Sequence, residues 1–589
     1  MDKYRRRFLS LSTGVIISTG LINLGLSDEK KLGNGQFLHG VASGDPLQDK
    51  VIIWTRLSPE KVTPSIGIIY EVSHKNDFST LIHTGIVYAE RENDFTVKVD
   101  LNKLEPGTRY YYRFRSANNV STIGNTITLP SHTKKMTFAV FSCSNFTSGY
   151  FNVYRDVCKL KNKIDLIIHL GDYIYEYGMY DESGKPAYGT KNSVKSGRQL
   201  PDDNDKALKS LNDYRRRYSL YRSDPDLQEL HKNFPVISIW DDHEILNNVY
   251  ALGVYDNDMT SNEYEKQKKS AIKAYYEWLP IRPPYGSESE KIYRSFHFGD
   301  LLSLYMLDTR LLSRSAQFDY SDYIKDQYFD EITFKKDISS SKRSLLGQDQ
   351  LEWLESELSN SNTRWQFIAQ QVKVTNSNVP LEIIKAANKY FKSEDKEEKA
   401  KLKKQITDSY YETSRIKARM TLNDATLTDD EKNRLSKMLP YNLDAWDGYP
   451  SERENLYKIL KSVNKPNVIL SGDTHFSWAS KFVNKLNQVL GIELGTTSVT
   501  SPGLEEDYDI DDPKLLRQLE DSVNVFDKNS LYSNFTDRGY LIVEVEEDEV
   551  KAHWRYISNI LSREYSVLNE RSHQLRIAYK NNQYYFRHR

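Results

Sequence analysis

From Met136 onward, short apolar runs of the chain are each followed directly by polar residues. The runs cover residues 137–141, 166–170, 236–240, 302–307, 365–369 and 467–470. Strands that end in polar residues and lead into helices are typical of α/β layering. Because open α/β sheets place their sites at the carboxyl ends of strands, we expect these polar side chains to gather in one place.

Residues 37–129 carry a different pattern, with short β-like segments separated by turns. Residues 51–55, 67–72, 94–99 and 110–114 are rich in β-branched and aromatic side chains, which favours strands. Several short strands at this spacing indicate a sandwich of about 90 residues. Leu104-Glu105-Pro106-Gly107-Thr108, together with the next strand, resembles a strand corner of a fibronectin type III domain. We predict a β-sandwich domain over residues 36–130 and an α/β domain over residues 131–560.

Charge and cysteine content exclude two classes of protein. The net charge is −1, from 81 basic and 82 acidic residues. The chain therefore lacks the excess of basic residues that would indicate a nucleic-acid partner. Two cysteines exclude a disulfide framework. Cys143 ends a predicted strand and Cys158 lies well into the helix predicted to follow, so their separation exceeds the reach of a disulfide.

The N-terminus has the order of an export signal. Arg5-Arg6-Arg7-Phe8-Leu9 precedes an uncharged, mostly small and apolar stretch over residues 11–26. This resembles a twin-arginine signal peptide over residues 1–27, which would make the twin-arginine translocase a partner. We expect a periplasmic or secreted protein. The sequence around Ser27 is a weak site for signal-peptide cleavage. The alternative that the signal is retained as a membrane anchor therefore stays open.

The polar residues at the strand ends include a set suited to two metal ions. Hydrolysis of phosphate esters needs neutralised phosphoryl charge and a nucleophile near neutral pH, and two adjacent metals supply both. Asp172, directly after an apolar run, can bridge two metals. Tyr175, three residues later, can return to the same place. Cys143 can add a thiolate that the metal itself deprotonates.

The remaining ligands come from two further strand ends. Asp242 follows one apolar run and is predicted to bind the second metal, while His243 can donate a hydrogen bond to a phosphoryl oxygen. Asp473 and His475, two residues apart on a loop, can reach different metals. Each residue alone is weak support, because an aspartate at a strand end is often a cap or turn residue.

Other polar residues near these runs have structural interpretations. We interpret His169, inside a run, as a hydrogen-bonded core histidine. Asp241 and Glu244 are either metal-site supports or purely structural. Asp308 and Arg310 are expected to pair with each other.

A set of motifs then points to a known family. F-S-C-S-N, H-L-G-D-Y-I-Y-E, W-D-D-H-E, L-L-G-x-x-Q-x-x-W-L and S-G-D-T-H resemble the alkaline phosphatase D family of metallophosphoesterases, as do His39–Pro46 and Trp54–Arg56. The resemblance covers residue 37 to about 556. It implies a four-layer α/β/β/α metallophosphatase sandwich after the β-sandwich, and an exported enzyme that hydrolyses phosphate monoesters and diesters. We accordingly predict Asp172 and His243 as catalytic residues, and His243 and Asn145 as substrate-binding residues.

The ligand types bear on metal identity. Related purple acid phosphatases have an aspartate, an asparagine and a histidine where this chain has Cys143, Asp242 and Asp473, and a further histidine position holds Gln370 or Gln371. The second metal then contacts mostly oxygen, which favours calcium (Ca2+) over zinc. Cys143, Asp172, Tyr175 and His475 suit ferric iron (Fe3+). The family's iron and calcium centre agrees with this interpretation.

Three segments depart from the motif set. Residues 313–343 and 380–440 are polar insertions, and the second has helical spacing that indicates a solvated helix or, alternatively, a lid. Residues 561–589 are basic and tyrosine-rich and are expected to be either a frayed tail or a segment folded over the active site.

Two other functions stay open from the sequence. The domain could be a non-catalytic binding module that keeps the phosphatase fold, although all six ligand positions are filled. It could also be a zinc or manganese nuclease, although such sites favour histidine at the positions of Asp242 and Asp473.

Overall fold

The computed structural model describes residues 32–588, except 256–257, 285–289, 326–327 and 511. The predicted export signal at residues 1–27 lies outside this range. Within the described part of the chain, no helix combines the length and the apolar character needed to cross a membrane.

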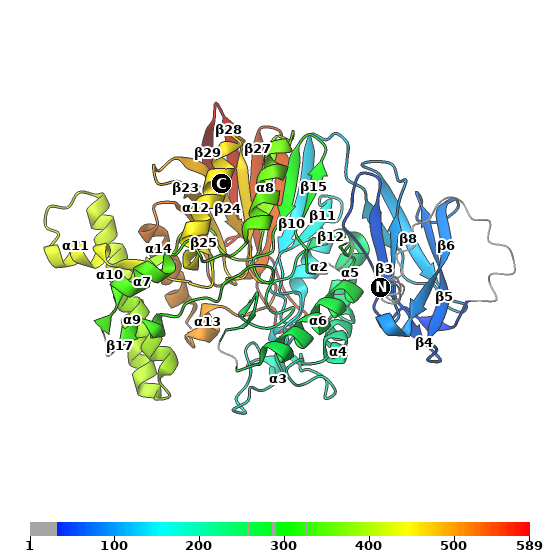
Figure 1. Cartoon of the computed structure of the whole chain (residues 1–589), viewed down its shortest axis with the longest axis horizontal. Helices are drawn as coiled ribbons and strands as arrows, with labels where there is room; N and C mark the ends of the chain where they lie inside the picture. The colour runs from blue at the N-terminus through cyan, green and yellow to red at the C-terminus, as the bar shows by residue number, and fades with distance from the viewer. Residues whose placement is uncertain (1–31, 256–257, 285–289, 326–327, 511, 589) are drawn as a thin grey trace, which may run out of the picture.

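The centre of the molecule is a pair of β-sheets packed face to face (Figure 1). In the first sheet, β10 (Lys135–Phe141), β11 (Leu166–His169) and β12 (Pro235–Ser238) are parallel. In the second, β16 (Leu302–Met306), β19 (Trp365–Ala369), β22 (Asn467–Ser471) and β24 (Val489–Gly495) are parallel. Phe138 and Phe367 meet between the sheets with ring centroids 5.6 Å apart.

Antiparallel strands complete both sheets. The second sheet adds β15 (Arg294–Phe298) at one end and β23 (Ser477–Val483) and β25 (Ser530–Asn534) at the other. The first sheet continues from β10 through β26 (Arg538–Glu546), β27 (Glu549–Ile557), β28 (His573–Lys580) and β29 (Gln583–His588). Residues 573–588 are therefore edge strands of the first sheet, which corrects the expectation of a frayed tail or a segment over the active site.

Helices cover the outer faces of both sheets. α2 (Asn152–Cys158) packs on β26 and β27, and α5 (Pro225–Asn233) packs on α2. α8 (Gln348–Asn360) and α12 (Pro450–Ser462) form one apolar cluster with β19 and β22. Asp224 caps α5 through the backbone N–H groups of Asp226 and Leu227, and Pro225 occupies its first turn, where a missing N–H costs nothing. The predicted four-layer α/β/β/α sandwich is confirmed.

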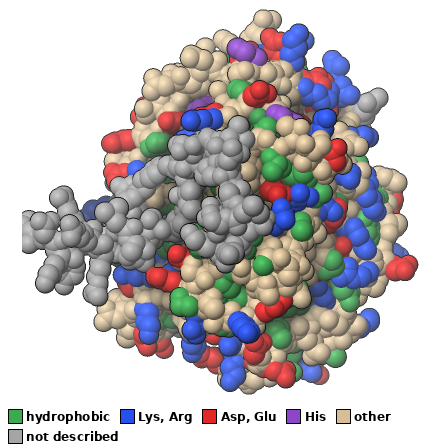
Figure 2. All heavy atoms as spheres, turned by 90° about the vertical axis from the view of Figure 1, so that its right-hand side faces the viewer, with side chains coloured by type: hydrophobic (Ala, Val, Ile, Leu, Met, Phe, Trp, Pro, Cys, Tyr) green, Lys and Arg blue, Asp and Glu red, His purple; other side chains and the backbone are tan. Residues whose placement is uncertain are grey.

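The N-terminal domain is the predicted β-sandwich. One sheet has the order β6-β5-β8-β9, from β6 (Leu81–Glu90), β5 (Ser65–Ser73), β8 (Arg109–Arg115) and β9 (Gly124–Ile127). The facing strands are β2 (Val41–Gly44), β3 (Val51–Arg56) and β7 (Thr96–Leu101), and one apolar cluster lies between them. In Figure 2, basic and acidic side chains are interspersed on the visible part of the face at this end of the molecule.

The two domains share a sheet, which the sequence analysis did not anticipate. β2 pairs in parallel with β12, with Ser43 opposite Pro235 and Gly44 opposite Val236. A Cβ atom at Gly44 would lie 2.4 Å from the Pro280 carbonyl oxygen and 2.5 Å from that of Val236, so only glycine fits this approach. The ten-stranded first sheet thus runs from the C-terminal hairpin into the N-terminal domain.

The insertions fold on one side of the molecule, at the left of Figure 1. Residues 313–343 include η4 (Tyr320–Asp322) and α7 (Glu331–Ile338). Residues 380–440 form α9 (Leu381–Lys392), α10 (Lys396–Thr421) and α11 (Asp429–Ser436), in agreement with the helical spacing. α10 packs against both α9 and α14 (Pro513–Phe526), whereas α11 buries no residue.

Candidate metal centre

The predicted ligands meet where the two sheets end. Cys143 follows β10, Asp172 follows β11, Asp242 follows β12, and Asp473 and His475 follow β22. Three groups have candidate ligand atoms within 4.8 Å of one another: Cys143 with Asp172 and His475, Asp172 with Asp242 and His243, and Asp241 with Asp242 and Asp473. Asp172 and Asp242 each belong to two of these groups, and Asp172 is the carboxylate that links the group of Cys143 and His475 to the group of Asp242 and His243.

Four of these residues have a left-handed backbone. The φ angles are 61° at Cys143, 55° at Asp172, 64° at Asp473 and 62° at His475. Non-glycine residues adopt this region rarely and at some cost in energy, and such residues concentrate at functional sites. The loops are fixed by hydrogen bonds from Cys143 N to Gly171 O (3.2 Å) and from Ser144 N to Asp172 O (2.8 Å).

We call Cys143, Asp172, Tyr175 and His475 the thiol cluster. The Tyr175 hydroxyl donates to Asp172 Oδ2 at 2.8 Å and lies 3.2 Å from His475 Nε2. Tyr175 returns to Asp172 through an irregular loop, not through a helical turn. On the other side of His475, the Tyr188 hydroxyl lies 2.9 Å from Nδ1 and orients the ring.

Burial makes the thiol cluster unfavourable for anions unless a cation is bound. Burial and the charge of Asp172 raise the pKa of the Cys143 thiol well above its usual range. Burial and the same carboxylate raise the pKa of Tyr175 as well. A bound metal ion reverses this effect, because its charge stabilises thiolate, phenolate and carboxylate together.

Asp172 carries an atom without a protein partner. Its side chain is buried, and Oδ1 has no hydrogen-bond partner among the residues that the structure describes. An unpaired buried carboxylate oxygen costs free energy unless a ligand reaches it. The donor set and this free oxygen therefore fit a metal at this position.

We call Asp241, Asp242, Asp444, Asp473 and Arg310 the carboxylate cluster. Arg310 is buried; its Nε contacts Asp241, and its Nη atoms donate to Asp444 and Asp473 at 2.8 Å each. Asp242 Oδ1 lies 3.7 Å from the same guanidinium.

The predicted ion pair between Asp308 and Arg310 is wrong, because the Arg310 guanidinium contacts the carboxylate cluster. Asp308 Oδ1 instead accepts the backbone N–H of Arg310 at 2.8 Å and that of Leu311 at 3.1 Å, so it shapes the turn.

Two further acidic residues support the ligand loops. Glu244 accepts backbone N–H groups from Asp172 at 3.0 Å and Asp241 at 2.8 Å, and also from Tyr173. It thereby ties the ends of β11 and β12 together. Asp241 contacts Arg310 and has one oxygen, Oδ2, without a partner among the described residues.

The side chains of the two glutamines that follow β19 form hydrogen bonds with other groups of the protein. Gln371 Nε2 donates to the carbonyl oxygens of Trp240 (2.7 Å) and Leu307 (3.0 Å). Gln370 Nε2 donates to Ser471 Oγ at 2.7 Å, and its oxygen accepts from Trp446. Gln371 therefore joins the strand ends of the two sheets, whereas Gln370 fixes neighbouring segments at the end of the second sheet.

His243 is held between an acid and an aromatic ring. Its Nδ1 lies 2.8 Å from Glu176 Oε2, and its ring lies 4.2 Å from that of Tyr175, measured between centroids. Although burial opposes a positive charge, the carboxylates of Glu176, Asp172 and Asp242 raise the pKa of His243 well above 6.5. Nε2 is the nitrogen that remains for a substrate.

Asn145 has a local structural role. Its Oδ1 accepts from the backbone N–H and the hydroxyl of Thr147, at 3.0 and 2.7 Å, and caps the short helix η3 (Phe146–Ser148). Its amide nitrogen is the remaining group that can donate to a ligand.

His169 and the cysteines agree with their interpretations. His169 is buried, lies 3.0 Å from the Tyr154 hydroxyl, and has its pKa lowered to about 3 by burial. Cys143 and Cys158 are both free.

Sequence reasoning misjudged Arg310 and missed Asp444, Glu176 and Tyr188. Arg310 was noticed but assigned the wrong partner, and Asp444 and Glu176 were not considered. Glu176 follows Tyr175 directly, so the motif itself carried the signal. Asp444 lies 134 residues from Arg310 in the chain, and no local pattern connects them.

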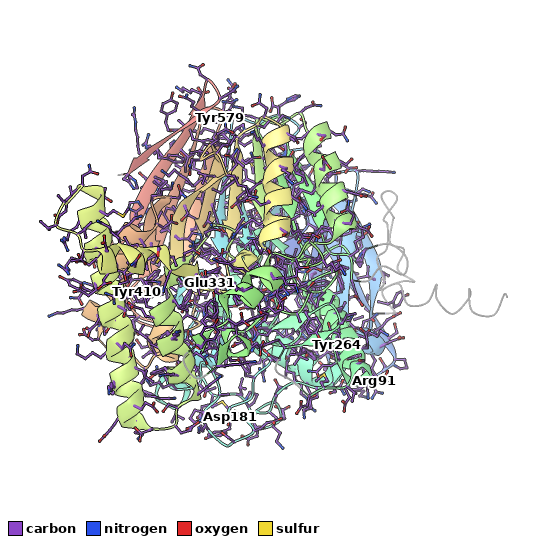
Figure 3. The ribbon with its side chains drawn as sticks, turned by 60° about the vertical axis from the view of Figure 1, so that its left-hand side comes forward. Arg91, Asp181, Tyr264, Glu331, Tyr410 and Tyr579 are labelled. Atoms are coloured by element: carbon purple, nitrogen blue, oxygen red, sulfur yellow. The ribbon has the colours of Figure 1, made fainter. Side chains whose placement is uncertain are left out.

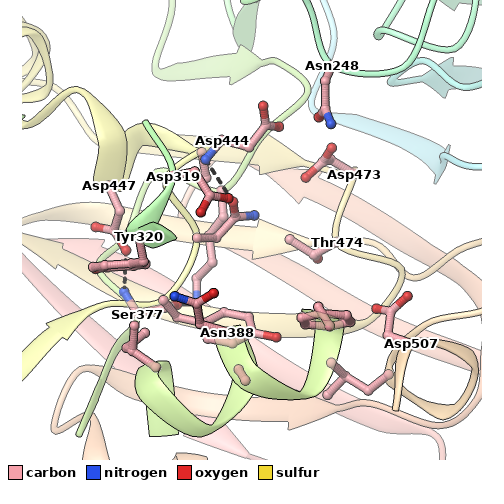
Figure 4. Close-up of a pocket in the computed structure, with 18 of the residues that line it drawn as sticks. Asn248, Asp319, Tyr320, Ser377, Asn388, Asp444, Asp447, Asp473, Thr474 and Asp507 are labelled. Carbon is pink, nitrogen blue, oxygen red and sulfur yellow. Dashed lines mark hydrogen bonds between the residues drawn. The ribbon is translucent and has the colours of Figure 1, made fainter. Parts of the chain in front are cut away.

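A pocket of ≈ 680 Å³ opens onto the centre. Asp473 and His475 lie on its wall, as do residues of α9 and Asp319 from the two insertions. Figure 4 shows Asp319 beside Asp444, with Asn388 of α9 and Asp473 at other parts of the wall. The second insertion therefore borders this pocket with α9, whereas its helix α11 buries no residue.

Comparisons with known proteins agree with this geometry. Residues 138–554 match the PhoD-like phosphatase family, and residues 24–130 match the N-terminal domain of PhoD-like phosphatases. Alkaline phosphatase D of Bacillus subtilis (strain 168) is 30% identical over 578 residues, which covers 94% of this chain and 84% of the relative. A solved structure of PhoD matches with a TM-score of 0.69 at 27% identity, covering 93% of this chain and 92% of that one. The chain belongs to the PhoD-like phosphatase family and is a phosphoric ester hydrolase.

Proposed function

We propose that this enzyme is an exported alkaline phosphatase and phosphodiesterase with an iron and calcium centre. The thiol cluster would hold Fe3+ through Cys143, Asp172, Tyr175 and His475. Asp242 and Asp473 of the carboxylate cluster would hold Ca2+, with Asp172 reaching both metals. The single observation that carries this proposal is the buried Oδ1 of Asp172, which has no hydrogen-bond partner among the described residues and belongs to a side chain shared by two of the candidate groups.

The ligand chemistry supports different metals at the two positions. A thiolate and a phenolate together are suited to iron, whereas a set of carboxylates suits calcium. When bound, two such metals neutralise phosphoryl charge and lower the pKa of water.

The protein groups then position and polarise the substrate. His243 Nε2 would donate to a phosphoryl oxygen, since Glu176 fixes Nδ1 and favours the charged ring. The amide nitrogen of Asn145 would donate to a second phosphoryl oxygen. Asp172 serves both sides of the site, so its removal affects every part of the reaction.

Export is the remaining part of the proposal. It is supported by Arg5-Arg6-Arg7-Phe8-Leu9 and the uncharged stretch that follows. The twin-arginine translocase carries folded proteins, which suits an enzyme whose metals are inserted before export. A reporter fused to residues 1–35 should leave the cytoplasm only while the paired arginines are intact.

The test of the catalytic proposal is metal analysis of the untagged protein, run beside hydrolysis of a chromogenic phosphodiester and monoester with and without calcium. Iron together with calcium-dependent turnover is the expected result. Zinc or manganese with calcium-independent turnover would favour the nuclease alternative. Absence of both metal and turnover would favour a non-catalytic binding module.

A further inference from the structure

A second cavity, of ≈ 90 Å³, adjoins the active-site pocket and has a largely apolar lining. Lys373, Tyr441, Phe476 and Tyr508 line both spaces, so the cavity and the pocket are neighbours that share a wall. Its far side is formed by α10 of the second insertion and by α14. Tyr410 of α10, labelled in Figure 3, and Phe526 of α14 stack there with ring centroids 5.6 Å apart.

The chain itself leads from the metal centre into this cavity. His475 of the thiol cluster is followed by Phe476, which lines both spaces, and by Trp478 of β23, which lines the cavity. At about 3.3 Å per residue, Trp478 lies roughly 10 Å along the chain from His475. The segment from His475 to Trp478 therefore connects the metal centre with the lining of the cavity.

Lys373 lines both the pocket and the cavity. Its Nζ donates to Ser377 Oγ at 2.8 Å and lies 5.4 Å from the centroid of the Trp478 ring. The ammonium group of Lys373 therefore lies beside a residue that lines both spaces and beside an aromatic ring of the cavity.

We propose that the cavity binds an unbranched alkyl or acyl group carried by a phosphodiester substrate. A volume of ≈ 90 Å³ is too small for a bulky ring system but can hold a short, slender chain. The inference rests on the proposed function, because the phosphoryl group must sit at the metal centre for the chain to reach the cavity.

The experiment uses diesters that share one leaving group. Methyl, butyl and hexyl 4-nitrophenyl phosphate differ only in the group that stays on phosphorus. In each case water adds across the P–O bond to the aryl group, which leaves an alkyl phosphate and 4-nitrophenol. We expect kcat/KM of the metal-loaded enzyme to rise at least tenfold from methyl to hexyl, since each buried methylene contributes to binding.

Two phenylalanine substitutions on α14 localise the effect. Val523→Phe fills the cavity, whereas Val525→Phe places the same ring at a position that is 41% exposed. The hexyl-to-methyl ratio of kcat/KM should fall to about one in Val523→Phe and stay as in the wild type in Val525→Phe. The wild-type chain-length series decides the proposal even when Val523→Phe does not fold.

Equal kcat/KM for methyl and hexyl esters in the wild type would overturn the inference and leave the proposed function intact. An unchanged ratio in folded Val523→Phe would also overturn it. Absence of turnover for every ester, the methyl ester included, would overturn the proposed function and the inference with it.

Discussion

The thiol cluster and the carboxylate cluster neutralise negative charge in different ways. In the thiol cluster, one buried oxygen of Asp172 has no partner in the part of the chain that the structure describes, and burial raises the pKa of Cys143 and Tyr175. In the carboxylate cluster, the buried guanidinium of Arg310 contacts Asp241, Asp444 and Asp473. One side therefore lacks an internal cation among the described residues, and the other already contains one. This difference predicts unequal metal affinity and unequal effects of substitution.

The largest effect is expected at the residue that both sides share. Asp172→Ala removes a ligand of both proposed metals, so kcat/KM should fall by more than roughly 10³-fold, because even one lost transition-state donor costs 10²–10³-fold. Metal content of the purified variant should fall in parallel. Wild-type turnover with both metals lost would contradict the mechanism.

Substitution of the thiol tests one side alone. Cys143→Ser should lose iron and any visible thiolate-to-iron absorption, and kcat should fall by about 10²-fold or more, because a changed metal environment costs at least 10–100-fold. Calcium content should change little. Cys158→Ser is the matched control, since Cys158 lies at the end of α2 and not in the cluster. Equal iron loss in both variants would remove the thiol from the ligand set.

Chelation separates the two sides without mutation. Oxygen ligands bind calcium more weakly than a thiolate and phenolate bind ferric iron. Treatment with a calcium-selective chelator should therefore lower activity by roughly tenfold or more, as expected for loss of one metal of a pair. Activity should return when calcium is added, and elemental analysis should find iron unchanged throughout. Loss of iron at the same chelator concentration would show that the two sides are not distinct.

Removal of the internal cation should destabilise the calcium-free protein. Arg310→Met leaves several buried carboxylates unpaired, which should lower the free energy of unfolding by about 3–5 kcal/mol. Added calcium should restore part of this loss. Arg434→Met breaks a partly exposed pair with Glu382 and should cost about 1 kcal/mol or less. A calcium-independent loss in Arg310→Met would argue against a calcium site there.

The smallest effect concerns pH. Glu176 and the neighbouring carboxylates raise the pKa of His243 in the folded protein well above 6.5. The resulting stability is fully present below about pH 6.5 and is lost as pH rises through the folded pKa. In metal-free protein, Glu176→Gln should therefore be less stable than wild type by about 1.5–3 kcal/mol near pH 6, and by less near pH 10. Chemical denaturation at both pH values measures this, with the exposed Glu182→Gln as control.

The convergence of the candidate ligands was predictable, because the carboxyl ends of parallel strands meet at one edge. Cys143, Asp172, Asp242 and Asp473 each follow an apolar run, and the structure brings them together. The partners of Arg310 were not predictable, since they come from loops after three different strands. The same reason hid the pairing of Gly44 with Val236, residues 192 positions apart whose contact no local pattern encodes.

The shared sheet also restricts how the N-terminal domain can be handled. β12 has β11 on one side and β2 on the other, and Asp242 lies just beyond its end. A chain cut after residue 130 would expose a row of unpaired backbone N–H and C=O groups along β12, and such edges recruit other chains. The N-terminal domain thus covers an edge of the catalytic sheet that would otherwise be exposed. Truncation of this domain should yield aggregates in place of a smaller enzyme.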